Sequence, residues 1–271
     1  MNPIDVMIYS DMDGTLLSSW EKGPIISEKN THAIHQFIEN GGLFSIATGR
    51  NMKNGPTYFN NYILELPMVL VNGALIYDQK HQTIMRKVAL NPSFLHEALH
   101  YDEHHDNVIL VISDLDEVYH VLYPNKSYDH SPALDFPTRT IRYEDVKQLD
   151  VLKVTFVTHP EDKSDVMNDI MQMPSFKKVS ISPSSRRFIE IVNQGINKAE
   201  AIQYVKNHYH IHRTLVCIGD YLNDEEMLDH ADIACIPQNG LDSLKKPGRL
   251  ITKHHDDDAI ADLIDQLERM Q

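Results

Sequence analysis

Short apolar runs alternate with amphipathic stretches near both ends of this chain. The N-terminal part predicts strands over Val6–Ser10, Leu43–Ala47 and Met68–Val71, separated by helices over Glu28–Asn40 and Met52–Leu64. The C-terminal part continues the alternation with these segments: helix Lys198–Tyr209, strand Leu215–Ile218, helix Asp224–His230, strand Ile233–Ile236, strand Arg249–Thr252 and helix Asp257–Arg269. Alternation of this kind is typical of an α/β fold, with a mostly parallel sheet covered by helices on both faces.

The middle of the chain has a different pattern, in which strand-like runs follow one another with few helices between them. The strands expected there are Val108–Ile112, Val118–Leu122, Leu152–Val157, Lys178–Ser182 and Phe188–Val192. Adjacent strands with short connections favour an antiparallel sheet. We therefore predict an α+β domain over residues 85–192, inserted into an α/β core formed by residues 1–84 and 193–271.

Composition narrows the possible classes of protein. The 271 residues include 39 acidic and 25 basic side chains, a formal net charge of −14, and no basic stripe, so a nucleic-acid partner is not expected. No apolar run approaches the roughly 20 residues that a membrane helix needs. The N-terminus lacks the apolar core of a signal peptide. We expect a cytoplasmic protein with no membrane partner, in which Cys217 and Cys235 are buried free thiols.

Polar side chains follow several of the predicted core strands at the point where each strand ends. These groups are the carboxylates of Asp11, Asp13, Asp220 and Asp224, the hydroxyl of Thr48, the ammonium of Lys198 and the amide of Asn223. In an open parallel sheet, ligands bind beyond the carboxyl ends of the strands. Gathered carboxylates repel one another unless a cation joins them, and oxygen ligands of this kind suit Mg²⁺. A hydroxyl, a lysine and helix-start N–H groups beside that metal suit a phosphate.

Four segments resemble, in order, the four motifs of the haloacid dehalogenase superfamily of phosphohydrolases. The segments are "DMDGTLL" from Asp11, "IATGR" from Ile46, "NQGINKAEA" around Lys198 and "GDYLNDEEML" from Gly219. "VNGALIYD" at 71–78 resembles the Cof-type branch, whose members are mostly sugar-phosphate and small organophosphate phosphatases. The resemblance covers the whole chain and implies a Rossmann-like core with an inserted C2-type cap.

The resemblance also implies a role for each motif residue. Asp11 is expected to be the nucleophile that takes the phosphoryl group as an aspartyl-phosphate. Asp13 is expected to protonate the leaving oxygen and then to activate water. The phosphate would be held by Thr48, Lys198, Asn223 and the backbone amides of Met12 and Gly49. The alternative role of Asn223 is to position Asp220, and the resemblance leaves these two roles open.

The same resemblance implies a Mg²⁺ site. Its expected ligands are Asp11, the backbone carbonyl of Asp13, and Asp220, with Asp224 nearby. Whether Asp224 binds the metal directly or through water stays open at this stage.

These features predict a Mg²⁺-dependent phosphatase of small phosphorylated metabolites. A large cap closing over the site implies a small substrate, since a polymer would not fit beneath it. A phosphomutase with the same core and cap is an alternative. A non-catalytic metabolite sensor is another, although a sensor has no need of the second acid, Asp13. The identity of the substrate and the oligomeric state stay open.

Several other segments carry possible chemistry that we interpret as structural. Pro237-Gln238-Asn239-Gly240 departs from the Met-Gly-Asn-Ala turn that is usual in the Cof-type branch, which leaves the local loop open. Ser113–Glu117, with its second Asp-x-Asp pair, is expected to be a solvated hairpin turn. His96, His100 and His104 are expected to form a solvated helix face, and His254–Asp258 a loop and helix start. Trp20 is expected to serve packing.

Overall fold

The core is a five-stranded parallel sheet in the computed structural model, which describes residues 1–19, 23–60, 63–134 and 136–270. The strand order is β14-β13-β12-β1-β2. The bounds are β1 Val6–Ser10, β2 Leu43–Ile46, β12 Thr214–Ile218, β13 Ile233–Pro237 and β14 Leu250–Thr252. All neighbouring pairs in this sheet run parallel, as the strand–helix alternation predicted.

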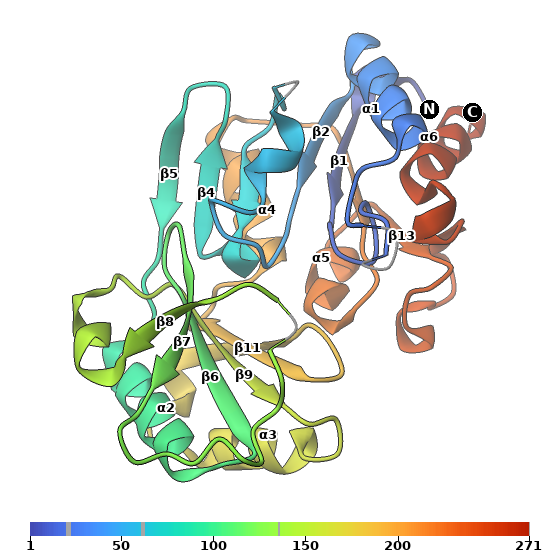
Figure 1. Ribbon diagram of the computed structural model, residues 1–271. Coiled ribbons are helices and arrows are strands. Elements are labelled where there is room, and N and C mark those ends of the chain that lie inside the picture. The colour runs from blue at the N-terminus through green and yellow to red at the C-terminus, as the bar shows by residue number, and fades with distance from the viewer. Residues whose placement is uncertain (20–22, 61–62, 135, 271) are drawn as a thin grey trace.

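Helices cover both faces of the core sheet (Figure 1). Helices α1, Glu28–Glu39, and α6, Ala259–Arg269, pack together on one face, and α4, Lys198–His208, packs with α5, Glu225–Asp229, on the other. Along β1, the side chains of Val6 and Ile8 join the cluster under α1 and α6, whereas Met7 and Tyr9 join the cluster under α4 and α5. Helix α1 ends at the Gly41-Gly42 pair, where Gly41 has a φ of +88° and Gly42 donates its N–H to the carbonyl of Phe37.

A three-stranded antiparallel sheet extends the core beside β2. It consists of β3 Met68–Leu70, β4 Leu75–Asp78 and β5 Thr83–Lys87. A parallel bridge between Ala47 and Val69 joins it to the core sheet. The turn between β3 and β4 places Val71 and Asn72 in the left-handed region, each with a φ of 51°.

The inserted domain is built on a six-stranded sheet of order β10-β11-β9-β6-β7-β8. Its elements are α2 Pro92–His104, β6 Val108–Ser113, β7 Val118–Leu122, β8 Arg139–Arg142, β9 Lys153–Thr158, α3 Lys163–Gln172, β10 Val179–Pro183 and β11 Phe188–Asn193. We call this domain the cap. Helices α2 and α3 pack on its sheet through a hydrophobic cluster separate from those of the core, as the α+β pattern predicted. The division at residues 84/85 and 192/193 stays a prediction.

Two features differ from the sequence-based expectation. The cap sheet is mixed rather than antiparallel, because β8 begins beside the start of β7 and pairs parallel to it. The helix predicted over Met52–Leu64 is wrong over residues 52–60. Those residues form a turn and a short 3₁₀ helix, Pro56–Phe59, because Pro56 has no N–H to continue a longer helix. Residues 61–62 of that helix, and Trp20, lie outside the described residues.

Two further expectations concern solvent and membrane. Cys217 and Cys235 are free thiols that lie fully buried in the core, as predicted. Burial raises the pKa of both thiols well above the usual range. Among the helices of the described residues, none is long and apolar enough to cross a bilayer.

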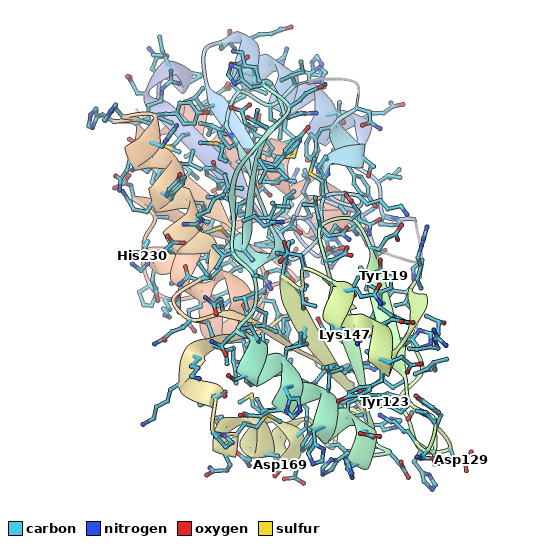
Figure 2. All side chains as sticks on the ribbon, turned by 90° about the vertical axis from the view of Figure 1, so that its left-hand side faces the viewer. Tyr119, Tyr123, Asp129, Lys147, Asp169 and His230 are labelled. Atoms are coloured by element: carbon cyan, nitrogen blue, oxygen red, sulfur yellow. The ribbon has the colours of Figure 1, made fainter. Side chains whose placement is uncertain are left out.

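A buried ion pair joins α2 to the strands of the cap. Lys126 donates to Asp102 over 2.5 Å and to the carbonyl of Val108 over 2.7 Å. Both charged side chains are almost completely buried. The ammonium lies 5.8 Å from the ring centroid of Tyr123, on the cap (Figure 2), and 5.5 Å from that of Tyr128. Two aromatic rings and a carboxylate thus replace the water that the ammonium loses.

We expect Lys126→Met to lower the free energy of unfolding by about 3–5 kcal/mol, because it leaves the Asp102 carboxylate buried without its cation. The double variant Lys126→Met/Asp102→Leu should recover most of this loss. Urea denaturation of the two variants and the native chain measures the effect. Lys53→Met, which breaks the exposed Lys53–Glu117 pair, is the control and should cost less than about 1 kcal/mol. A double variant as unstable as the single one would contradict this account.

Candidate active site

The polar residues predicted from the motifs meet where β1, β2 and β12 end. Strand β1 pairs with β12 up to Ser10 and Ile218, and the N–H of Asp11 continues the ladder by donating to the carbonyl of Ile218 over 2.9 Å. The Asp11 side chain therefore begins at the sheet edge and is buried, with 5% of its surface exposed. This edge faces the cap, whose strands lie below the core in Figure 1.

Lys198 connects the motifs at the centre of this edge. Its Nζ donates to Asp11 Oδ1 over 2.5 Å and to Asp224 Oδ1 over 2.6 Å. Lys198 is the first residue of α4, where the Asn197 side chain caps the helix by accepting the N–H of Glu200 over 2.7 Å. Asn197 thus fixes where α4 begins, and the start of α4 fixes the direction from which the Lys198 ammonium enters the site.

Asp220 and Asp224 belong to the loop between β12 and α5. Asp224 is fully buried and its Oδ2 accepts the N–H groups of Asp220, over 3.0 Å, and Tyr221, over 3.2 Å. Asp220 Oδ1 accepts the hydroxyl of Thr15 over 2.9 Å, which ties this loop to the first motif. Ligand oxygens of Asp11, Asp220 and Asp224 lie within 4.8 Å of one another.

Crowding in this cluster changes the acidity of its carboxyl groups. Burial raises the pKa of Asp11 well above its usual range, the charge of Lys198 opposes that rise, and the neighbouring aspartates add to it. Burial and the charge of Asp224 raise the pKa of Asp220 to about 7. One lysine therefore does not balance the cluster, and a further cation would be bound where these oxygens converge.

Gly14 makes room for this cluster. Its φ is +79°, and a Cβ atom built there would lie 2.5 Å from Asp220 Oδ2. Asn239 holds the same turn from the other side, because its Nδ2 donates to the carbonyl of Gly14 over 2.7 Å and its Oδ1 accepts the N–H of His255 over 2.9 Å. The Pro237–Gly240 segment thus keeps the asparagine contact with the first motif although its other residues depart from the usual turn.

Arg50 is the residue at this edge that the sequence reasoning did not assign to the site. Its guanidinium donates two hydrogen bonds to Asp13, over 2.8 Å from Nε and 2.6 Å from Nη2. It also donates to the hydroxyl of Tyr58 over 3.0 Å. The side chain of Asp13 is 47% exposed and points to Arg50. The arginine that closes "IATGR", one residue after the predicted Gly49, was the available signal.

The remaining predicted residues lie around this centre with differing exposure. Thr48 is buried at the end of β2, and its hydroxyl accepts the N–H of Arg50 over 3.2 Å. Asn223 is half-buried on the 3₁₀ turn Leu222–Asp224, beside Asp224. The side chain of Met12 is buried in the core cluster, so any role in the site falls to its backbone.

The turn over Ser113–Glu117 is not simply solvated, contrary to our expectation. The N–H of Met52 donates to the carbonyl of Leu115 over 3.1 Å, and the Leu115 side chain packs against the core cluster. Lys53 also forms an ion pair with Glu117 over 2.7 Å. The turn therefore seats the cap on the core next to Arg50.

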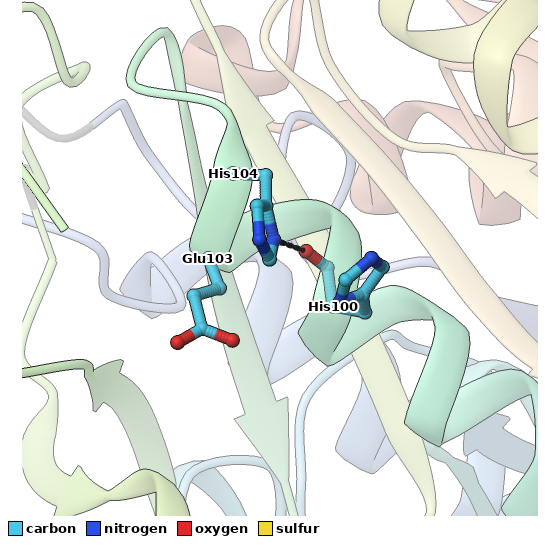
Figure 3. A group of neighbouring side chains, drawn as sticks. All are labelled: His100, Glu103 and His104. Atoms are coloured by element: carbon cyan, nitrogen blue, oxygen red, sulfur yellow. Dashed lines mark hydrogen bonds between the residues drawn. The ribbon is translucent and has the colours of Figure 1, made fainter. Parts of the chain in front are cut away.

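Two histidine clusters lie outside the carboxylate site. On α2, His100, Glu103 and His104 have ligand atoms within 4.8 Å of one another, but Nδ1 of His104 lies 2.8 Å from the carbonyl of His100, and both histidines are exposed (Figure 3). His254, His255 and Asp256 form the second cluster, in which Nδ1 of His255 lies 2.7 Å from the carbonyl of Leu17. In both clusters a ring nitrogen is already engaged by backbone.

Comparison with known proteins agrees with this geometry. The 5-amino-6-(5-phospho-D-ribitylamino)uracil phosphatases YitU and YwtE of Bacillus subtilis are 26% and 25% identical to this chain, over 94% and 96% of it and 94% and 97% of their own lengths. A solved sugar phosphatase of haloacid dehalogenase subclass IIB has the same fold, with a TM-score of 0.80 at 20% identity over 97% of this chain and 98% of that one. A haloacid dehalogenase-like hydrolase from B. subtilis also superposes with a TM-score of 0.80, at 16% identity over 96% and 99% of the two chains.

A profile described as haloacid dehalogenase-like hydrolase matches residues 8–264, from the middle of β1 into α6. The match includes the four motif segments and the whole cap. The chain therefore belongs to the haloacid dehalogenase-like hydrolase family, as its motifs predicted.

Proposed function

We propose that this protein is a Mg²⁺-dependent phosphatase of small phosphorylated metabolites that works through an aspartyl-phosphate on Asp11. The observation that carries the proposal is the contact of Lys198 with both Asp11 and Asp224, which joins three motifs in one buried cluster at the sheet edge. A buried carboxylate held by a lysine is a nucleophile that is already desolvated and oriented.

In the proposed reaction, the Asp11 carboxylate attacks phosphorus while the bond from phosphorus to the leaving oxygen breaks. Asp13 donates a proton to that oxygen, so the leaving group departs as an alcohol. Water then attacks the phosphorus of the aspartyl-phosphate, and Asp13 accepts a proton from it. Phosphate leaves and the Asp11 carboxylate is restored.

Arg50 is part of this proposal because its guanidinium donates two hydrogen bonds to the Asp13 carboxylate. To act as an acid, Asp13 has to leave the guanidinium and take up a proton. A phosphate bound beside Gly49 competes for the same guanidinium, since arginine binds phosphate and carboxylate through the same donors. Substrate entry would thereby release the acid that the reaction needs. Thr48, Lys198, Asn223 and the amides of Met12 and Gly49 would hold the phosphoryl oxygens.

The carboxylates of the cluster fit Mg²⁺, because the oxygen atoms of Asp11 and Asp220 converge there, and burial together with the charge of Asp224 raises the pKa of Asp220. Both oxygens of Asp224 already accept hydrogen bonds, from Lys198 and from two backbone amides. Asp224 would therefore support the ion through water, while Asp11, Asp220 and the carbonyl of Asp13 bind it directly. Bound Mg²⁺ would neutralise charge on the transferring phosphoryl group.

The substrate class follows from the cap and from the relatives. Leu115 and Glu117 of the cap contact the core beside Arg50, so the cap touches the core next to the site, as expected for an enzyme of small substrates. The names of the two B. subtilis relatives specify a phosphorylated ribityl compound, and the solved subclass IIB structure is a sugar phosphatase. We infer a phosphomonoester of a sugar or sugar-alcohol type. Turnover of a panel of such esters with Mg²⁺ present, scored by released phosphate, tests this function.

We expect Asp11→Asn to reduce turnover by about 10⁴-fold or more, because the amide keeps the shape of the side chain but cannot attack phosphorus. Steady-state phosphate release measures the loss, and thermal melting checks that the fold survives. Asp242→Asn, on an aspartate whose side chain is 97% exposed, is the matched control and should keep native turnover. Substantial hydrolysis by purified Asp11→Asn protein would exclude the covalent mechanism.

Asp13→Asn should reduce turnover more for an alkyl phosphate than for p-nitrophenyl phosphate. An alkoxide needs protonation as it leaves, whereas p-nitrophenolate leaves without it, so we expect the two losses to differ by about tenfold or more. The ratio of kcat/KM for the two substrates in the native and variant proteins measures this difference. If both substrates lose activity equally, Asp13 is not the acid.

The charge of Asp220 predicts how pH affects the metal-free protein. Its folded-state pKa of about 7 lies above the unfolded value, so the stability it contributes is complete below about pH 4 and is lost as pH rises to about 7. In chelator, the melting temperature should therefore fall across this range, and saturating Mg²⁺ should reverse the fall at pH 8. Asp220→Asn should show a shallower fall and little response to Mg²⁺. Identical pH and Mg²⁺ responses in the two proteins would contradict the assigned site.

A further inference from the structure

A buried polar network crosses from the cap to the loop that follows β2. On the cap side, Lys153 at the start of β9 forms an ion pair with Glu190 of β11. On the core side, Lys153 Nζ donates to the carbonyl of Gly49 over 2.9 Å, and Asn72 Nδ2 donates to Glu190 Oε2 over 2.8 Å. The exposed fractions of Lys153, Glu190 and Asn72 are 5%, 6% and 1%, so these contacts are largely shielded from solvent.

The core partners of this network belong to one tightly connected unit. The N–H of Asn72 donates to the carbonyl of Thr48 over 2.9 Å, and the N–H of Val71 donates to the carbonyl of Arg50 over 3.0 Å. The left-handed conformation of Val71 and Asn72 directs both amides at the loop Thr48–Arg50. Whatever holds Asn72 therefore also holds this loop.

Gly49 lets the network approach the loop closely. A Cβ atom at this position would lie 3.2 Å from Asn72 Oδ1, 3.2 Å from Glu190 Oε2 and 3.4 Å from Lys153 Nζ. All three polar side chains thus converge on the α-carbon of Gly49. The polar side chains therefore contact the backbone of the Thr48–Arg50 loop in the space that a side chain at position 49 would occupy.

The division of charge between the two domains has a mechanical consequence. Lys153 and Glu190 are on neighbouring strands of the cap sheet, so the positive and negative charges move together when the cap moves. Separation of cap and core would break two hydrogen bonds to neutral groups, Gly49 and Asn72, and would leave no single charge behind. The contact can therefore open and close reversibly, whereas a buried ion pair split between the domains would resist opening.

We propose that Lys153 and Glu190 are positioning residues that order the Thr48–Arg50 loop when the cap is seated. Closure places a cation on the Gly49 carbonyl and a carboxylate on Asn72, and these contacts set the orientation of the loop's N–H groups and of Arg50. The proposal rests on the proposed function, because it assigns phosphate binding to this loop. Cap closure and phosphate affinity are then thermodynamically linked, so each strengthens the other.

The test compares two double variants that each replace a buried ion pair by apolar residues. Lys153→Met/Glu190→Leu removes the network at the cap–core contact, and Lys126→Met/Asp102→Leu removes the equally buried pair inside the cap. Replacement of both partners preserves packing, so both proteins should fold with melting temperatures near the native one. Three quantities are measured: melting temperature, affinity for inorganic phosphate with Mg²⁺ present, and amide hydrogen exchange over residues 48–50 and 69–72.

We expect Lys153→Met/Glu190→Leu to weaken phosphate binding by about tenfold or more, the effect of one lost charge-assisted hydrogen bond. Exchange of the amides of Thr48, Val71 and Asn72 should also become faster. Lys126→Met/Asp102→Leu should bind phosphate within about twofold of the native protein, with unchanged exchange in these segments. If the first variant binds and exchanges like the native protein, or if both variants weaken binding equally, the positioning role is wrong.

A third variant covers the case in which the first fails to fold. Lys153→Arg keeps a cation and donors at the Gly49 carbonyl, and it should retain most of the loop protection against exchange. Loss of this protection in a folded Lys153→Arg protein would argue against the contact with Gly49. If the native protein does not bind phosphate at all, the proposed function fails, and the exchange measurements alone then decide whether the pair orders the loop.

Discussion

Carboxyl groups from separate motifs meet at the carboxyl edge of the core sheet, and the ammonium of Lys198 holds Asp11 and Asp224 together there. Without a cation, mutual repulsion in a buried site would push these strand ends apart or protonate them. The helix cap at Asn197, the small volume of Gly14 and the amides that hold Asp224 all serve this arrangement. The contact of Lys198 with both carboxylates is thus the interaction on which the conformations of the surrounding loops depend.

The cap also contacts the core at this edge of the sheet, through residues outside the carboxylate cluster. Its two connections to the loop after β2 are unlike each other: Leu115 and Glu117 lie in a partly exposed turn, whereas Lys153 and Glu190 are buried. A partly exposed contact exchanges readily with water and contributes little free energy, whereas a buried one requires nearly complete pairing to form. The exposed turn can therefore guide the cap into place, and the buried pair can distinguish a seated cap from one that is merely close.

Local pattern was sufficient for the five strands of the parallel core sheet and for α1, α4, α5 and α6, because each of these segments has its own apolar periodicity. Those signals predicted that Asp11, Lys198 and Asp224 lie at one edge of the sheet. Contacts between distant segments could not be obtained in this way. The pairing of Asp13 with Arg50, the parallel course of β8 beside β7 and the docking of Leu115 all depend on where a loop goes in space. The helix predicted after β2 is wrong for a local reason. The Gly55-Pro56 step interrupts a helix there, and the prediction had followed the apolar periodicity alone.

The burial of both cysteines has a practical consequence for following cap motion. Cys217 and Cys235 lie inside the core sheet with pKa values well above the usual range, so neither offers a thiolate to a reagent in neutral solution. The sequence contains no other cysteine. A thiol introduced on the cap and another on the core could accordingly be labelled without reaction at the native cysteines. A fluorescent or spin-labelled pair at these positions would then report the distance between the two domains.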